Sequence, residues 1–303
     1  MASVSLVASP LIEIVSAQAP PQRGQAAPAG AAATPPYPLP PAKPRQKIKQ
    51  SVMNSVWRGL NNSFEDKCKI LQQIGFKGVD LPTAQQVPIM KQYGLTPTMM
   101  TGTGTTMQNG FMRKELHDAQ EAACHAGIDA CVAAGCANLI GFAGEKRGMS
   151  PAEAADNTVA IFSRLKDYAE QKNVNICLEI TNSKVVGDAR TDMAFDRLAW
   201  GLDVCKRVKS PRFKILYDMY HVQIMDGDVT RNLRDHVDMI CHIHVAGVPS
   251  RQEIDSTQEL NYRFIANAIA DLGFTGFVAH EYRPTPGRDP IKSLEQCFEI
   301  MNV

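Results

Sequence analysis

The sequence has no long apolar run, no excess of charge of either sign and few cysteines. Its 303 residues carry 32 Lys and Arg against 31 Asp and Glu, a net charge of +1. Proteins that coat nucleic acid usually carry a strong basic excess, so we expect no nucleic-acid partner. No stretch approaches the roughly 20 consecutive apolar residues of a membrane span, so we also expect no membrane partner.

Several motifs are also missing. The eight cysteines form no Cys-x-x-Cys pair, which argues against a disulfide framework or a structural zinc site, and we interpret them as buried thiols. There is no phosphate-binding Walker A motif. The segment after the first predicted strand, Arg58-Gly59-Leu60-Asn61-Asn62, lacks a dinucleotide-binding glycine pattern. An open nucleotide-binding sheet is therefore disfavoured.

The first 47 residues differ in composition from the rest. Nine of the 19 prolines lie between Ala19 and Gln46, mostly among Ala, Gly and Gln. Such a segment has too little apolar surface to offset its ordering entropy, so we predict that residues 1–47 are disordered. Ala17-Gln18-Ala19 is similar to a signal-peptidase site, although no basic segment precedes it. A truncated export signal with a periplasmic location, and a disordered tail on a cytoplasmic protein, both stay open.

From residue 48 onward, short β-rich apolar runs alternate with longer segments of helical spacing. Helices are predicted at 63–74, 112–134, 150–172, 191–208 and 261–272, the third beginning with the N-cap pattern Ser150-Pro151-Ala152-Glu153. Eight such alternations predict that residues 48–303 form an α/β fold, a (β/α)8 TIM barrel. The predicted strands are 51–57, 76–81, 96–101, 138–142, 175–181, 214–219, 240–246 and 276–282.

Four consecutive predicted strands end in side chains that can bind a metal: Glu179, Asp218, His244 and Glu281. The C-terminal ends of strands are where a barrel carries its active site. One such residue alone is more often a salt-bridged structural group, but four on successive strands favour a shared site. Three carboxylates and one imidazole suit a single divalent Mn²⁺, Mg²⁺ or Co²⁺ ion better than a structural zinc ion.

The sequence around these strand ends is specific. The motifs are LEITNS at 178–183, DMYHVQIMDGD at 218–228, HIHVAGVPSR at 242–251 with ELNY at 259–262, and GFVAHEYRP at 276–284. They resemble the xylose-isomerase-like TIM-barrel superfamily, and within it most closely the hydroxypyruvate isomerase family. The resemblance extends from about Gln50 to the C-terminus and is strongest after Asn175.

The resemblance implies roles for individual residues. The metal ligands would be Glu179, Asp218, His244 and Glu281. Glu179 and Glu281 would also be the catalytic acid/base pair, and His221 and Arg251 would bind substrate oxygens. His242 shares a strand face with His244 and is expected to support it. An alternative for Arg251 is a salt bridge within its own loop, to Glu253 or Asp255.

The implied reaction removes a proton next to a carbonyl group and passes through a cis-enediolate. Protonation of the neighbouring carbon gives isomerisation of a small hydroxy-carbonyl compound or sugar, whereas protonation of the same carbon from the other face gives epimerisation. Hydroxypyruvate isomerases usually carry Gln in place of His244, a histidine typical of ketose 3-epimerases, and Glu-Pro-Ile-Asn in place of Glu179-Ile180-Thr181-Asn182. A hydroxypyruvate isomerase, a ketose 3-epimerase, and a keto-sugar lyase or binding protein therefore stay open.

A DNA-repair endonuclease on the same barrel is disfavoured. Such an enzyme needs further zinc-binding histidines near strands two to four, where this sequence has only His117 and His125, both in a predicted helix. The balanced charge also argues against a DNA-binding surface. A homo-oligomer is compatible with a barrel of this type, although no residue pattern demands one.

Overall fold

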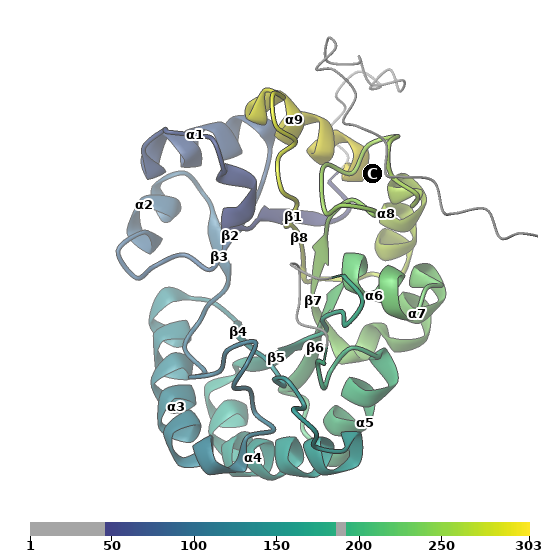
Figure 1. Cartoon of the computed structure of the whole chain (residues 1–303). Helices are drawn as coiled ribbons and strands as arrows, with labels where there is room; N and C mark the ends of the chain where they lie inside the picture. Colours follow the sequence, from purple (N-terminus) through teal and green to yellow (C-terminus); the bar gives the residue numbers. More distant parts are fainter. Residues whose placement is uncertain (1–45, 186–191) are drawn as a thin grey trace, which may run out of the picture. The chain divides into compact units, whose positions relative to one another are not determined.

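The computed structural model describes residues 46–185 and 192–303. Eight parallel strands form one sheet, with helices outside it (Figure 1). The predicted (β/α)8 barrel is confirmed, and each predicted strand overlaps one observed strand. The strands are β1 (Lys49–Val52), β2 (Gly78–Asp80), β3 (Thr96–Met99), β4 (Asn138–Gly141), β5 (Asn175–Glu179), β6 (Phe213–Asp218), β7 (Ile240–Val245) and β8 (Phe277–His280).

The strand order closes the sheet on itself. Strands are hydrogen-bonded in the order β3-β2-β1-β8-β7-β6-β5-β4. The two ends of this series meet through Met100, which follows β3 and forms a parallel bridge with Leu139 of β4. The N–H of Met100 donates to the carbonyl of Asn138, and the N–H of Ile140 donates to the carbonyl of Met100, each over 2.9 Å. The C-terminal ends of all eight strands therefore gather at one end of the barrel.

All five predicted helices are present, and the structure adds others. The predicted N-cap of α4 is confirmed, because the Ser150 hydroxyl accepts a hydrogen bond from the N–H of Glu153 over 3.1 Å. The helices are α1 (Phe64–Ile74), α2 (Val87–Gln92), α3 (His117–Ala134), α4 (Pro151–Lys172), α5 (Leu198–Val208), α6 (Met219–Met225), α7 (Val229–His236), α8 (Tyr262–Asp271) and α9 (Pro290–Met301). We did not predict α2, α6, α7 or α9.

Three predicted boundaries are wrong because loop contacts replace the regular backbone. Residues 54–57 form a short 3-10 helix after β1 instead of extending the strand, and Val56 and Trp57 are both buried rather than alternating. The helix predicted from residue 112 begins at His117, since the N–H of Met112 donates to the carbonyl of Ala143. The helix predicted from residue 191, which lies outside the described residues, begins at Leu198.

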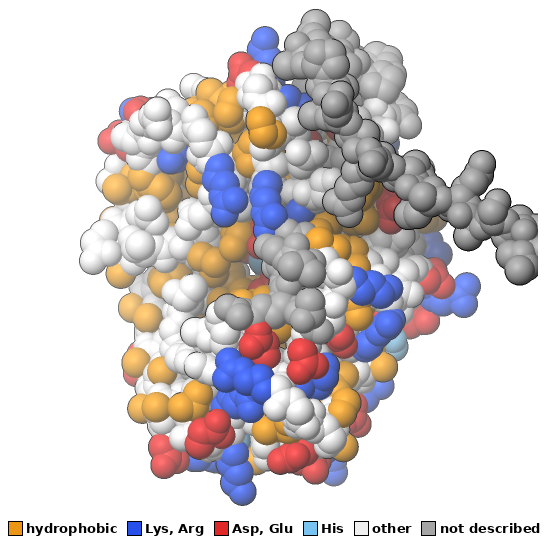
Figure 2. All heavy atoms as spheres, in the orientation of Figure 1, with side chains coloured by type: hydrophobic (Ala, Val, Ile, Leu, Met, Phe, Trp, Pro, Cys, Tyr) orange, Lys and Arg blue, Asp and Glu red, His pale blue; other side chains and the backbone are white. Residues whose placement is uncertain are grey.

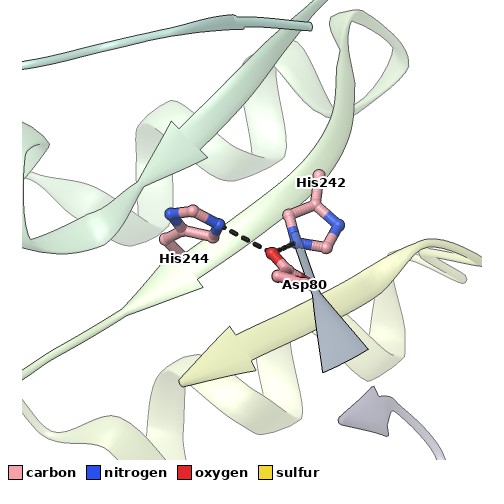
Figure 3. A group of neighbouring side chains, drawn as sticks. All are labelled: Asp80, His242 and His244. Atoms are coloured by element: carbon pink, nitrogen blue, oxygen red, sulfur yellow. Dashed lines mark hydrogen bonds and ion pairs between the residues drawn. The ribbon is translucent and has the colours of Figure 1, made fainter. Parts of the chain in front are cut away.

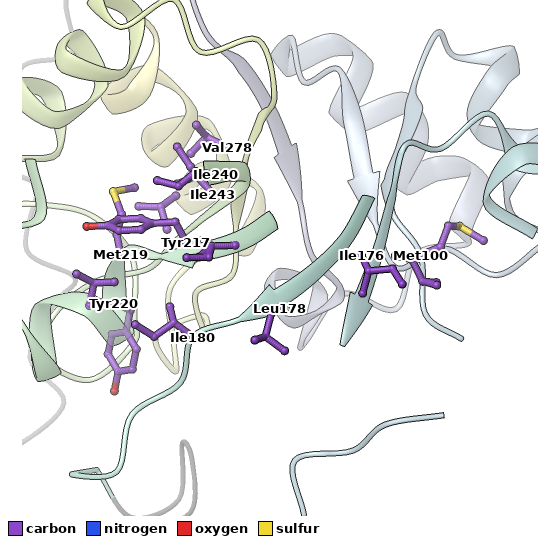
Figure 4. Close-up of a cluster of buried hydrophobic side chains, with 14 of the residues drawn as sticks. Met100, Ile176, Leu178, Ile180, Tyr217, Met219, Tyr220, Ile240, Ile243 and Val278 are labelled. Atoms are coloured by element: carbon purple, nitrogen blue, oxygen red, sulfur yellow. The ribbon is translucent and has the colours of Figure 1, made fainter. Parts of the chain in front are cut away.

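The main hydrophobic core lies between the strands and the helices, and strand alternation decides which side chains enter it. Ile176, Leu178 and Ile180 of β5 and the segment after it belong to this core (Figure 4). Cys177 and Leu216 instead belong to a smaller cluster with Met99 and Ile140. Two residues further along the same strand faces come the carboxylates Glu179 and Asp218. The pleat that builds the core therefore aims these two side chains into the barrel.

Other expectations have mixed outcomes. All eight cysteines are free, and seven are buried, as predicted. In the described part of the chain, no helix has the length and apolar character needed to span a membrane. The predicted disordered segment, residues 1–47, falls outside the described residues except for its last two positions.

Candidate active site

The four predicted metal ligands come together at the C-terminal end of the barrel. Asp218 and His244 lie opposite each other in register on β6 and β7. Glu281 follows β8, and its N–H donates to the carbonyl of Val245 over 2.9 Å. Together with Glu179 at the end of β5, each residue offers one ligand atom, and these atoms lie within 4.8 Å of one another. All four residues are buried, with Glu281 the most exposed at 9%.

His244 and Arg251 link the carboxylates of this cluster. Nδ1 of His244 lies 2.6 Å from Oε2 of Glu281 and 3.4 Å from Oε1 of Glu179. Nη2 of Arg251 lies 2.8 Å from the same Glu281 oxygen and 3.1 Å from Oδ2 of Asp218. The guanidinium group also covers the ring of Tyr220, 5.0 Å from its centroid. Two cationic groups thus compensate three buried acids.

Arg251 therefore pairs with neither Glu253 nor Asp255, the two partners of the alternative loop salt bridge. Its side chain is only 5% exposed and reaches inward from the loop after β7. The acids of that loop have other donors. Arg288 lies 2.6 Å from Asp255, and Thr285 donates its N–H to Glu253 over 3.0 Å. Residues outside the cluster thus hold the loop in place, and the Arg251 side chain is directed at Asp218 and Glu281.

His221 borders the cluster, with Nδ1 toward Asn182 and Nε2 toward Arg251 and Asp218. The Oδ1 atom of Asn182 accepts from the N–H groups of Lys184 and Val185 over 3.1 and 2.8 Å, which fixes the orientation of the amide. The Asn182 Nδ2 donor then lies 2.8 Å from Nδ1 of His221. Nε2 lies 3.0 Å from Nη1 of Arg251, which can only donate, and 3.3 Å from Oδ2 of Asp218. His221 thus meets a donor at each ring nitrogen and joins Asn182 to the cluster.

The electrostatic surroundings shift the pKa values of the two glutamates in opposite directions. Burial raises the pKa of Glu179 and of Asp218. Burial also opposes ionisation of Glu281, but the adjacent Arg251 and His244 outweigh it and lower the Glu281 pKa. Burial and the nearby Arg251 lower the pKa of His221, so that its imidazole is neutral. Two carboxylates held in different protonation environments at one site are suited to acid and base roles.

Asp80 and Asn182 belong to this network, and sequence reasoning did not single out either of them. Asp80 ends β2 and is fully buried, and its Oδ2 accepts from Nε2 of His242 over 2.8 Å and from Nε2 of His244 over 3.0 Å. The signal that could have found Asp80 is the one used for β5 to β8, an acidic residue at the end of an apolar strand. His242 supports His244 through their shared hydrogen bonds to Asp80 and through an edge-to-face contact of the two rings.

The four residues fit a divalent cation. Nδ1 of His244 and Oε2 of Glu281 are buried and lie 2.6 Å apart, and among the described residues their contacts are ion pairs rather than hydrogen bonds of regular geometry. Both atoms are therefore directed at the shared space between the side chains. Three carboxylate oxygens and one imidazole nitrogen form a hard, oxygen-rich donor set of the kind that Mn²⁺ and Mg²⁺ prefer.

The comparison with protein families shows to which family this chain belongs. The model of the xylose isomerase-like TIM barrel family matches residues 68–299, more than half of the chain. The chain belongs to this family. The crystal structure of a 3-keto-D-glucoside 4-epimerase from E. coli superimposes with a TM-score of 0.71 at 17% identity, over 84% of this chain and 98% of that chain. At this identity the likeness shows the fold alone.

Two curated proteins that this chain resembles carry isomerase names. A putative hydroxypyruvate isomerase of Xenopus laevis is 38% identical over 91 residues, which are 30% of this chain and 32% of that protein. A 2-oxo-tetronate isomerase of Haemophilus influenzae is 27% identical over 233 residues, 73% of this chain and 88% of that protein. The more identical of the two matches thus spans only about a third of the relative's length.

Proposed function

We propose that this chain is a divalent-cation-dependent isomerase of small hydroxy-carbonyl acids, of the hydroxypyruvate isomerase type. The observation that carries this proposal is the convergence of Glu179 and Glu281 on one buried point beside Asp218 and His244. The isomerase names of the relatives support it. A divalent cation held by the four residues supplies a Lewis acid, which makes the C–H next to a carbonyl group more acidic.

The two glutamates would move the carbon-bound proton. Their strands, β5 and β8, are separated in the sheet by β6 and β7, so the two carboxylates reach the shared space from different sides. One glutamate takes the proton from the hydroxyl-bearing carbon, which leaves an enediolate. The other moves the hydroxyl proton to the former carbonyl oxygen, and a proton returns to the former carbonyl carbon. No oxidant or further reactant is needed.

His221 and Arg251 would hold the substrate oxygens. His221 is neutral, and its Nε2 lies at the site beside Arg251 and Asp218, so it would contact a carbonyl or hydroxyl oxygen of the substrate. Arg251 stays charged, since Glu281 and Asp218 outweigh its burial and raise its pKa. Its planar fork suits the carboxylate of a 2-oxo acid. A substrate that carries such a carboxylate would thus be oriented with its reacting carbons toward the glutamates.

Epimerisation of a ketose is the second candidate. His244 stands where the resemblance to hydroxypyruvate isomerases leads us to expect Gln, and the same two carboxylates could remove a proton from one face of a carbon and return one to the other. On the face of the molecule seen in Figure 2, acidic and basic side chains of the described residues are mixed, with no single basic surface. This supports a small-molecule substrate over nucleic acid.

Proton NMR in D₂O tests the proposal and separates the two candidates. The Mg²⁺-loaded chain would be incubated in turn with hydroxypyruvate, with tartronate semialdehyde and with a set of ketoses. The matched controls are the EDTA-treated chain and the Glu281→Gln variant. We expect cation-dependent deuterium incorporation with hydroxypyruvate and formation of its aldehyde isomer. Exchange confined to C3 of a ketose would establish epimerisation instead. Absence of exchange with every compound would refute both candidate functions and would favour a lyase or a binding protein.

A further inference from the structure

Asp80 is a carboxylate inside the barrel with four hydrogen-bond donors around it. It ends β2 and is fully buried. Its Oδ1 accepts from the hydroxyl of Ser51 on β1 over 3.2 Å and from the hydroxyl of Thr98 on β3. Its Oδ2 accepts from two imidazoles of β7, those of His242 and His244 (Figure 3). The carboxylate thus joins four strands at the level just below the candidate active site.

These contacts decide which nitrogen of His244 faces the glutamates. A carboxylate only accepts hydrogen bonds, so Nε2 of His244 must carry a proton where it meets Asp80. Nδ1 is then the atom that is directed at Glu281 and Glu179. A bound cation would take the place of the Nδ1 proton, whereas the Asp80 contact keeps the proton on Nε2, so Nδ1 is the nitrogen that would offer its lone pair. A carboxylate behind a metal-bound histidine fixes both the tautomer and the ring orientation.

We propose that Asp80 is a positioning residue, which acts through Nε2 of His244 to set the cation affinity of the site. The inference rests on the proposed cation-dependent function. His242 fills the remaining lone pairs of Oδ2, and its ring meets that of His244 edge to face at a centroid distance of 5.2 Å. His242 therefore keeps Asp80 from turning away from His244.

A second cation bound by Asp80, His242 and His244 is the competing interpretation, because these three side chains also cluster closely enough. Two observations favour hydrogen bonds instead. The separations of 2.8 and 3.0 Å between the nitrogens and Oδ2 are those of charge-assisted hydrogen bonds. Ser51 and Thr98 already occupy the other oxygen of Asp80, so this carboxylate has few lone pairs left for a metal.

The test is Mn²⁺ binding to the full chain, measured by calorimetry and by metal analysis, for wild type and Asp80→Asn. The asparagine keeps the shape but offers only one acceptor oxygen, so we expect one Mn²⁺ per wild-type chain and roughly 10- to 100-fold weaker binding to the variant. Asp255→Asn is the matched control, since Asp255 is also buried and also satisfied by hydroxyl and cationic donors, Thr257 and Arg288. It should bind Mn²⁺ like wild type.

A spectroscopic measurement separates positioning from a general loss of packing. In ¹⁵N NMR of the Mg²⁺-loaded chain, Nε2 of His244 should be protonated in wild type and should lose this single state in Asp80→Asn. Equal Mn²⁺ affinity of wild type and Asp80→Asn would overturn the role of Asp80 alone. Two Mn²⁺ ions per wild-type chain, one of them lost in the variant, would overturn it in favour of a second metal centre. A wild-type chain that binds no Mn²⁺ would overturn the proposed function as well.

Discussion

The side-chain amide of Asn182 donates a hydrogen bond to Nδ1 of His221 over 2.8 Å, across the gap between β5 and the first turn of α6. The opposite side of that amide is fixed by two backbone N–H groups, so the amide cannot rotate without losing both bonds. One residue of the LEITNS motif thereby fixes the position of the His221 imidazole. This link connects the motif after β5 with the motif after β6.

Asn182→Ala should lower turnover by roughly tenfold, since loss of about one hydrogen bond at Nδ1 changes the orientation and the tautomer of the His221 ring that faces the substrate. Steady-state kinetics and ¹⁵N NMR of the histidine rings would measure the effect. Asn232→Ala is the control, because Asn232 donates a comparable bond to the carbonyl of Gly227. Unchanged turnover together with an unchanged His221 tautomer would contradict the role of Asn182.

Glu179→Gln and Glu281→Gln should each reduce turnover by at least roughly 100-fold, because an amide cannot accept the transferred proton. The two substitutions keep side-chain volume, so circular dichroism should show an intact barrel. Deuterium exchange at the substrate carbon can be followed separately from product formation. A variant that keeps near-normal turnover would show that the two-glutamate mechanism is wrong.

Arg251→Ala should raise KM by roughly 10-fold or more and change kcat less, if Arg251 holds a substrate carboxylate through charge-assisted hydrogen bonds. Arg251→Lys should recover only part of the loss, since an ammonium group lacks the planar fork. Arg207→Ala offers a control, because Arg207 pairs with Asp156 and Asp203 on the outer helices instead of the cluster. An unchanged KM in Arg251→Ala would show that Arg251 only compensates the charge of the buried carboxylates and does not hold the substrate.

The fold was largely predictable because its signals are local. Alternation of short apolar runs with helical spacing located all eight strands, and Ser150 marked the start of α4. Boundaries failed where tertiary contacts compete with local preference. Residues 193–195 look helical in sequence, yet Met193 bridges to Glu145 and the Phe195 carbonyl accepts from the N–H of Thr181. No local pattern reveals that these residues pair with distant loops.

The candidate site was predictable where strand ends carry the information. Glu179, Asp218, His244 and Glu281 each lie within one residue of the C-terminal end of their strand, so the barrel hypothesis alone predicts that they meet. Asp80 is different, because its importance depends on closure of the barrel, which brings β2 to face β7. Arg251 depends on backbone shape, since Ser250 and Arg251 have φ values of 80° and 56° that turn the loop inward. Neither residue type predicts such a turn.

Ser150→Ala should lower the free energy of unfolding by about 1 kcal/mol, because the first turn of α4 loses the acceptor for the Glu153 N–H. Ser163→Ala is the control in the same helix. The Ser163 hydroxyl donates to the Val159 carbonyl, which is already within the helical hydrogen-bond ladder, and alanine is the better helix former. Urea denaturation midpoints should fall for Ser150→Ala only, and an equal fall in both variants would disprove the capping contribution.

Removal of divalent cations should destabilise the chain, because it leaves the Glu179, Asp218 and Glu281 carboxylates buried together with only His244 and Arg251 to compensate them. A ligand that binds only the folded chain adds about 2.7 kcal/mol at 100 times its Kd, so Mn²⁺ should raise Tm by several degrees relative to EDTA. Asp218→Asn should reduce this Mn²⁺-dependent rise, since the variant has one carboxylate fewer for the cation. Asp203→Asn, on the exposed face of α5 beside Arg207, should keep the full rise. The difference between the two variants matters more than either Tm alone, because a general effect of salt on a barrel with balanced charge would act on both equally. A rise of the same size in Asp218→Asn and Asp203→Asn would therefore place the bound Mn²⁺ outside the candidate active site.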